Sequence, residues 1–236
     1  MLRPLAEKWF RIEVRGIDNI PDEGGALVVS NHSGTVPIDA LMTMVTVHDQ
    51  TDRFLRPLGA DLVFRLPVVA GMARRLGATL ACQADAERML TSGELVGVWP
   101  EGFKGIGKPF TERYKLQRFG RGGFVSAALR TGVPIVPLSV VAPRRSTRSS
   151  ATCPRSRGCS TCRTSRSRRS SRCSVRSAWC RCRRSGCWSS GSRSAPTPTE
   201  AEAEDPMLVF NLTDQVRETI QQTLFSLLLE RDSVFG

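Results

Sequence analysis

The sequence lacks any apolar run of the length that a membrane-spanning helix requires, which is about 18–20 residues. Its beginning, "MLRPLAEKWFRIEVRG", also lacks the apolar core of a secretory signal peptide. Cysteine is scarce over most of the chain, because Cys82 stands alone and the other seven cysteines lie between Cys153 and Cys187. These absences argue against a transmembrane span and a disulfide framework, and they favour a reducing, cytoplasmic location.

Acidic residues and lysine are both missing from Ala142 to Thr199, a stretch that contains 15 arginines. Removing those charges from the formal net charge of +12 leaves −3 for the rest of the chain. The high total charge is therefore no sign that the body of the protein binds nucleic acid or an anionic membrane. The chain length of 236 residues suits a single α/β domain.

Outside that stretch, compact apolar runs alternate with segments of helical periodicity. Alternation of this kind predicts an α/β fold, with a mostly parallel sheet flanked by helices. After residue 199 the helical pattern returns in a segment whose apolar positions are Val216, Ile220, Leu224 and Leu227. The predicted strands are 25–32, 53–61, 78–81, 94–102 and 133–141, and the predicted helices are 37–47, 67–77, 85–93 and 121–132.

The first residues can form a short amphipathic helix. Two interpretations are open: the helix docks on its own domain, or it lies in a membrane interface. The apolar face would carry Leu2, Leu5, Trp9, Phe10 and Ile12, with Arg3, Lys8 and Arg11 around it.

Three hypotheses compete for residues 142–199. The first is a disordered Arg/Ser arm that binds RNA or DNA, since a segment of low hydrophobicity and high like charge cannot form a core. The second is a zinc module built from Cys159, Cys162, Cys180, Cys182 and Cys187. Zinc sites usually use two C-x₂₋₄-C pairs or a histidine pair, whereas the stretch holds one such pair, Cys159 and Cys162, and no histidine.

The third hypothesis is a frameshift. Read with GC-rich codons and moved by one nucleotide, the letters of "SGCWSSGSRSAPT" give Lys-Trp-Leu-Leu-Glu-Phe-Gly-Glu-Pro-Ile-Arg-Thr-Asp, which is a plausible strand and turn. The letters of "APRRSTRS" become protein-like in the same alternative frame, and normal patterning resumes near Glu200. We therefore expect residues 142–199 to be a frameshifted, disordered segment without regular tertiary contacts.

The segment "NHSGTVPID" places two chemically useful side chains close together. His32 ends a predicted strand and Asp39 lies in the first turn of the next helix, which is where open α/β sheets bind ligands. A neutral imidazole can take a proton from a hydroxyl, while a carboxylate behind it fixes the tautomer and stabilises the imidazolium. The alternative is a structural histidine in a tight turn, paired with a capping aspartate.

A second candidate site is the turn "VWPEGFKG". Glu101 could bind a substrate hydroxyl, and Lys104, with Lys108 nearby, could bind a phosphate that Gly102 allows the backbone to approach. The alternative is a solvated turn, since Gly, Lys and Pro are common in loops. Cys82 fits a buried small residue better than a nucleophile.

Four segments in this order, "NHSGTVPID", "GATLACQADAERML", "GELVGVWPEGFKG" and "TGVPIVPLSV", resemble the four sequence blocks of the glycerolipid (lysophosphatidate/glycerol-3-phosphate) acyltransferase family. The resemblance covers about residues 4–141, and four ordered blocks are far more specific than one motif. Six residues separate His32 from Asp39, as in the acylglycerol and diacylglycerol acyltransferase-like branch, whereas four are common in the family.

The resemblance implies roles for individual residues. His32 matches the family's catalytic histidine and Asp39 its partner. In the second block Gln83 stands where the family usually has a phosphate-binding arginine, with Arg88 one turn further on, and the third block ends Phe103-Lys104 instead of Thr-Arg. The residues expected to bind substrate are Asn31, Ser33, Gly34, Arg88, Glu101, Gly102 and Lys104.

The resemblance also implies a function. It predicts an O-acyltransferase that moves a fatty acyl group from acyl-CoA or an acyl-carrier protein to a glycerol or lysophospholipid hydroxyl. We expect no cofactor, no metal and no specific nucleic-acid partner, and a cytoplasmic enzyme associated peripherally with a membrane surface. The alternatives are a nucleic-acid-binding protein that acts through its Arg/Ser segment, or an inactive frameshifted acyltransferase.

The domain organisation follows from the same comparison. Residues 1–141 form the acyltransferase domain, residues 142–199 the Arg/Ser/Cys-rich segment, and residues 200–236 a C-terminal helix of the same domain. Because the family's sheet normally continues where this chain turns to Arg, Ser and Cys, we expect a glycerolphosphate acyltransferase-like fold that is incomplete after residue 141.

Overall fold

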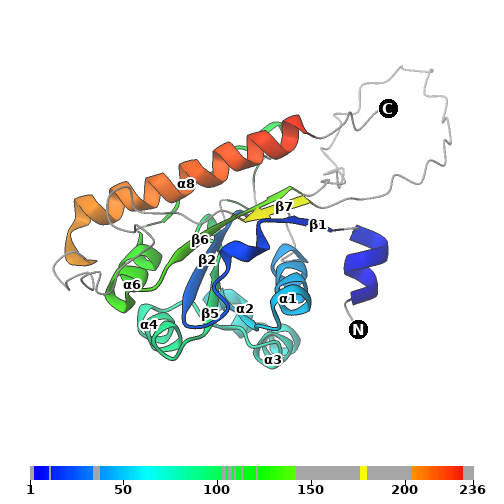
Figure 1. Cartoon of the computed structure of the whole chain (residues 1–236). Coiled ribbons are helices and arrows are strands. Elements are labelled where there is room, and N and C mark those ends of the chain that lie inside the picture. The colour runs from blue at the N-terminus through cyan, green and yellow to red at the C-terminus, as the bar shows by residue number, and fades with distance from the viewer. Residues whose placement is uncertain are drawn as a thin grey trace, which may run out of the picture.

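The computed structural model contains one seven-stranded sheet flanked by helices (Figure 1). It describes residues 3–10, 12–33, 38–102, 105, 108, 110–112, 114–120, 122–141, 176–179 and 203–230. The strand order is β1-β7-β6-β2-β5-β3-β4, and neighbouring strands are parallel except β6 and β7. The predicted mostly parallel α/β sheet is confirmed. The strands are β1 (Glu13–Arg15), β2 (Ala26–Ser30), β3 (Leu55–Gly59), β4 (Thr79–Leu80), β5 (Leu95–Val98), β6 (Ile135–Val141) and β7 (Arg176–Trp179).

The centre of the sheet is β2, which lies between β5 and β6. All five of its residues are buried, because helices cover both faces of the sheet and a strand in that position needs a continuous apolar sequence. Val29 pairs with Val98 of β5 and with Pro137 of β6, so the ends of these three strands lie at one edge. That edge is where the chain continues into the motifs that contain His32 and Glu101.

Helices pack on the two faces of the sheet around separate apolar clusters (Figure 1). One face is covered by α4 (Gln83–Thr91), α6 (Gly123–Thr131) and α8 (Pro206–Leu229). The other face is covered by α1 (Ile38–Thr51) together with the first residues of the chain. The remaining elements are η1 (Leu5–Phe10), η2 (Ile17–Asn19), α2 (Asp61–Arg65), α3 (Pro67–Arg75) and η3 (Phe110–Glu112).

The C-terminal helix α8 belongs to the same core as the strands. Its N-cap is Asp205, whose carboxylate accepts a hydrogen bond from the backbone N–H of Met207 at 2.9 Å and so satisfies one free donor of the first turn. Ser139 of β6 donates to the backbone oxygen of Ile220 at 3.1 Å. The positions whose spacing predicted the helix are all buried against the sheet: Val216, Ile220, Leu224 and Leu227.

The first described helix docks on its own domain. Ala6 is buried, Phe10 packs against the cluster under α1, and Arg3 forms an ion pair with Asp49 at 2.7 Å. Trp9 is 57% exposed. Of the helices that the structure describes, none is both long enough and apolar enough to cross a membrane.

The expectation that residues 142–199 make no regular contacts is wrong for four of them, and the sheet does continue past residue 141. Residues Arg176–Trp179 form β7, which pairs in parallel with β1 and antiparallel with β6. The physical reason is that strand pairing uses backbone groups, so a segment from an arginine-rich stretch can still pair with the open edge of β6. The other residues of the stretch, including the cysteines of the zinc hypothesis, lie outside the described residues.

Candidate active site

The side chains of His32 and Asp39 lie in contact, as the sequence predicts. His32 follows β2, and Asp39 is the second residue of α1 on the adjacent face of the sheet. His32 Nδ1 lies 3.1 Å from Asp39 Oδ2, and the two side chains are 12% and 1% exposed. The loop between them, 34–37, is outside the described residues, so Gly34 is not placed.

Asp39 is held in one orientation by backbone donors. Its Oδ2 also accepts the N–H of Ser33 at 3.0 Å, and its Oδ1 accepts the N–H of Ala40 at 2.9 Å. Its position in the first turn of α1 adds the favourable interaction of a carboxylate with a helix N-terminus. Because an ionised carboxylate can only accept, this contact favours the tautomer in which Nδ1 of His32 carries the proton and Nε2 keeps its lone pair.

The ring of His32 also lies near Trp99, the residue before Pro100. The two ring centroids are 6.2 Å apart with an angle of 25° between the planes. Trp99 is 8% exposed, and its Nε1 has no hydrogen-bond partner among the residues that the structure describes. The stacked indole limits the orientations open to the imidazole. Because the indole is uncharged, it adds no charge beside the ring.

Glu101 supports the backbone at the strand end that holds His32. Its Oε1 accepts the backbone N–H of His32 at 3.2 Å, and its Oε2 accepts the N–H of Gln117 at 2.9 Å. The same carboxylate forms an ion pair with Lys108, and both side chains are almost completely buried. Both oxygens thus bind protein donors in this structure, and contacts of Glu101 with an acceptor hydroxyl or of Lys108 with a phosphate stay predictions.

Helix α8 supports this arrangement from the opposite face of the sheet. Gln221 accepts the N–H of Leu116 at 2.8 Å and donates to the backbone oxygen of Tyr114 at 2.9 Å. That segment leads directly to Gln117, which binds Glu101. The C-terminal helix therefore fixes the segment that, through Glu101, fixes His32.

Three further residues are expected to bind substrate: Asn31, Gly102 and Lys104. Asn31 is buried and bonds to both backbone groups of Val140, at 2.8 and 3.1 Å, so it joins β2 to β6. Gly102 is exposed, with a φ of 53° in the left-handed region where glycine is favoured. Lys104 lies outside the described residues.

Arg88 is not brought to the dyad. It lies on α4, whose buried residues pack on the face of the sheet opposite to α1, and its side chain is 74% exposed and paired with Asp85 at 2.9 Å. The structure thus places Arg88 away from the dyad, and its role in acceptor binding stays a prediction.

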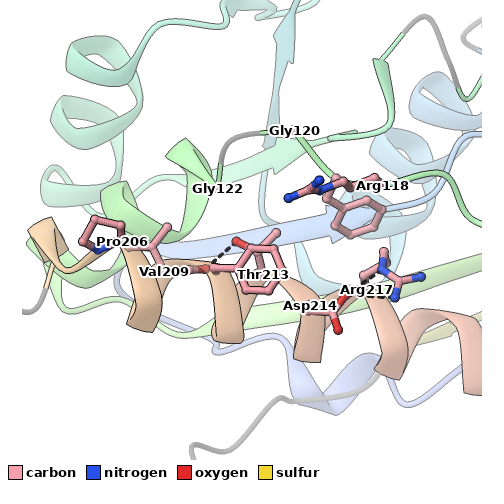
Figure 2. Close-up of a pocket in the computed structure, with 10 residues that line it drawn as sticks. Arg118, Gly120, Gly122, Pro206, Val209, Thr213, Asp214 and Arg217 are labelled. Atoms are coloured by element: carbon pink, nitrogen blue, oxygen red, sulfur yellow. Dashed lines mark hydrogen bonds and ion pairs between the residues drawn. The ribbon is translucent and has the colours of Figure 1, made fainter.

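A cavity of about 560 Å³ lies beside α8 rather than beside the dyad (Figure 2). Figure 2 shows Arg118 on the 118–122 segment facing Thr213 and Asp214 of α8. The guanidinium of Arg118 lies 5.4 Å from the ring centroid of Phe210, and Arg217 binds Asp214 at 2.8 Å. None of the expected site residues that the structure describes lines this cavity.

The described residues contain no group of three or more His, Cys, Asp or Glu side chains that could hold a metal ion. Cys82 is half-buried, and its Sγ donates to Asp85 Oδ2 at 3.1 Å. The geometry near His32 is thus that of a histidine–carboxylate pair.

The sequence of residues 11–141 matches the family model described as Acyltransferase. This chain belongs to the Acyltransferase family. The match includes both the dyad and Glu101, and it confirms the resemblance that the four ordered motifs predict. It also confirms the predicted enzyme class.

Relatives extend the comparison over the whole chain. An uncharacterized protein of Mycobacterium tuberculosis is 46% identical over 244 residues, covering 100% of this chain and 66% of the relative. A Mycobacterium leprae protein is 44% identical, covering 99% and 65%. This chain therefore spans about two thirds of the length of these relatives.

Two better-described proteins are more distant. The human "DGAT1/2-independent enzyme synthesizing storage lipids" is 30% identical over 147 residues, covering 61% of this chain and 44% of that protein. The crystal structure of the 1-acyl-sn-glycerophosphate (LPA) acyltransferase PlsC from Thermotoga maritima superposes with a TM-score of 0.51 at 19% identity, covering 92% of this chain and 72% of that one. The latter likeness supports the fold.

Proposed function

We propose that this chain transfers a fatty acyl group from an acyl thioester, acyl-CoA or acyl-carrier protein, to a hydroxyl of a glycerol or lysophospholipid acceptor. The observation that carries the proposal is the contact between His32 and Asp39 at a strand end, with Nε2 left as the free nitrogen. The names of the relatives support the acceptor class, since one acylates a lysophospholipid and another makes storage lipids.

The proposed reaction is direct transfer. His32 Nε2 takes the proton of the acceptor hydroxyl as its oxygen attacks the thioester carbonyl carbon, which forms a tetrahedral oxyanion. Collapse of that intermediate breaks the carbon–sulfur bond, and the imidazolium returns its proton to the leaving thiolate. The products are an ester and a free thiol, and the imidazole is neutral again without a covalent acyl-enzyme.

Asp39 and Glu101 act on different parts of His32 in this scheme. Asp39 holds the ring tautomer and stabilises the imidazolium that forms. Glu101 binds the backbone N–H of the same residue, so it is a positioning residue. Gly34 and Lys104 remain candidates for acceptor contacts, together with the backbone around Gly102.

The test is an acyl-transfer assay with a panel of acceptors. The purified full chain is incubated with radiolabelled palmitoyl-CoA and glycerol 3-phosphate, lysophosphatidate, monoacylglycerol or diacylglycerol, with thiol release followed in parallel. We expect one acceptor class to yield labelled ester with one thiol released per ester. Failure with every acceptor would contradict the proposed activity, and label that accumulates on the denatured protein would contradict direct transfer.

A further inference from the structure

Helices α2 and α3 present apolar side chains to solvent. Val68 is 82% exposed and Met72 is 56% exposed, and both lie on α3. Of the two helices only Ala70 is fully buried, so most of their apolar surface has no partner within the described chain. We call this the α2–α3 surface, formed by Leu62, Leu66, Val68, Val69, Met72 and Leu76, which are 37–82% exposed.

The charges within this surface have one sign. No acidic residue occurs between Asp61 and Asp85, whereas Arg65, Arg74 and Arg75 lie among the apolar positions and are exposed. The body of the chain outside residues 142–199 carries a formal charge of −3 even with these three arginines included, so this surface differs from its surroundings. An apolar helical face edged by arginines complements the interface of a bilayer that contains anionic lipids.

The α2–α3 surface begins at the sheet edge that holds the dyad. Strand β3 ends at Gly59, and α2 begins two residues later at Asp61. Because β2, β5 and β3 are adjacent and parallel, their C-terminal ends lie at the same edge, where His32 follows β2 and Glu101 follows β5. In Figure 1, α3 lies at the lower periphery of the molecule, on the side away from α8.

We propose that the α2–α3 surface docks on an anionic phospholipid bilayer and that this docking sets the dyad's sheet edge toward the lipid. The inference rests on the proposed function in one respect, because it supplies a lipid acceptor to that site. The binding itself follows from exposure and charge: apolar patches of this kind mark interaction sites, and arginine stems can lie along the acyl boundary with their guanidinium groups at the phosphates.

The test compares two pairs of substitutions in the full chain by co-sedimentation with phospholipid vesicles. The test variant is Val68→Asp with Met72→Asp on the α2–α3 surface. The matched control is Leu229→Asp with Met207→Asp on α8, whose side chains are exposed to a similar degree, 87% and 67%. Phosphatidylcholine vesicles in 0.5 M salt limit binding by the arginines of residues 142–199, because the Debye length is then only about 4 Å.

We expect the test variant to bind these vesicles at least about tenfold more weakly than the wild type, since burying one valine or methionine side chain changes an equilibrium by roughly ten- to a hundredfold. The α8 control should bind within about twofold of the wild type. Val68→Trp should bind more tightly, because tryptophan favours the bilayer interface. That gain keeps the proposal testable if the double aspartate variant does not fold.

A second pair of variants tests the role of charge. Arg74→Gln with Arg75→Gln should weaken binding to vesicles with 30% phosphatidylglycerol in 0.1 M salt by about tenfold or more, since each arginine near an anionic surface contributes roughly fivefold. Arg15→Gln with Arg217→Gln removes the same charge elsewhere and should have a smaller effect. Equal losses in the two variants would contradict the assigned charge complementarity.

Activity separates this proposal from the proposed function. With a short-chain thioester and a water-soluble acceptor, the Val68→Asp/Met72→Asp variant should turn over like the wild type, and it should lose activity on vesicle-embedded acceptors. If the wild type acylates nothing, the proposed function fails while the vesicle result still stands. Vesicle binding by the test variant as tight as that of the wild type would overturn the docking surface. Light scattering gives a second contradicting outcome: a wild-type dimer that these substitutions dissociate while vesicle binding stays unchanged.

Discussion

Replacing Lys108 by methionine tests whether the buried ion pair holds the strand end that contains His32. The substitution keeps a long, flexible side chain in the same space and removes the positive charge beside Glu101. The Glu101 carboxylate then keeps two backbone donors, from His32 and Gln117, but loses its ion-pair partner while it is fully buried. Removing one partner of a buried ion pair typically costs about 3–5 kcal/mol.

That cost is large enough to measure. In a domain of this size each kcal/mol lowers the melting temperature by about 2–4 °C, so we expect Lys108→Met to melt roughly 6–20 °C below the wild type by circular dichroism. Below that temperature, kcat should fall more than KM rises, because the change moves the backbone of His32 and leaves acceptor contacts in place. Lys108→Arg should recover part of both losses.

A double-mutant cycle separates the ion pair from simple loss of packing. If the pair is coupled as the structure indicates, Glu101→Gln with Lys108→Met should cost less than the sum of the two single changes by more than about 1 kcal/mol. Additive costs, or a Lys108→Met protein as stable as the wild type, would refute the reasoning.

Three further results are expected. Asp39→Asn should retain the fold and lose about 10²–10⁴-fold in kcat, because an amide cannot hold the tautomer or stabilise the imidazolium; activity within tenfold of the wild type would remove Asp39 from the mechanism. Gly25→Ala should cost about 1–3 kcal/mol in a denaturant titration, since the added Cβ would lie 2.2 Å from the backbone oxygen of Leu90, whereas Gly71→Ala, with open space at its Cβ, should be neutral or stabilising. Restoring the alternative reading frame over the DNA for residues 142–199 should raise solubility and acyl-transfer activity, and tight sequence-selective RNA binding by the present segment would speak against the frameshift hypothesis.

The central strands and the dyad were predictable because local sequence determines them. The apolar run before His32 must be a buried strand, and Asp39 falls in the first turn of the helix that follows, so their meeting at 3.1 Å needs no long-range information. The same holds for α8, whose apolar positions recur at helical spacing and face the sheet. The short strand β1 and helix α2 were not predicted, because three to five residues carry too little periodicity.

The role of Glu101 could not be predicted, because it depends on residues brought together by the fold. Its backbone partner Gln117 is 16 residues away, and His32 is 69 residues away. A glutamate in a Gly/Lys-containing turn suggests a solvent-facing group, yet its side chain is fully buried with that of Lys108. The only sequence signal was the apolar strand that precedes the turn, which indicates burial near Trp99 but not what the carboxylate binds.

Strand β7 was not predicted either, for a different reason. Composition predicts that an arginine-rich segment forms no core, and this argument concerns side chains. Pairing of Arg176–Trp179 with β1 and β6 uses backbone groups, on which composition has little bearing.

The most direct test of the proposed mechanism uses the two histidines of the chain. His32→Ala and His48→Ala are compared with the wild type in the acyl-transfer assay, with melting curves measured on the same samples. His48 lies in the last turn of α1, where it stacks on Phe54 at a centroid distance of 4.6 Å, so it controls for the loss of an imidazole away from the dyad. We predict that His32→Ala loses at least about 10²–10⁴-fold in kcat with its fold intact, while folded His48→Ala remains active. Turnover by His32→Ala within tenfold of the wild type would contradict the assignment of His32 as the general base.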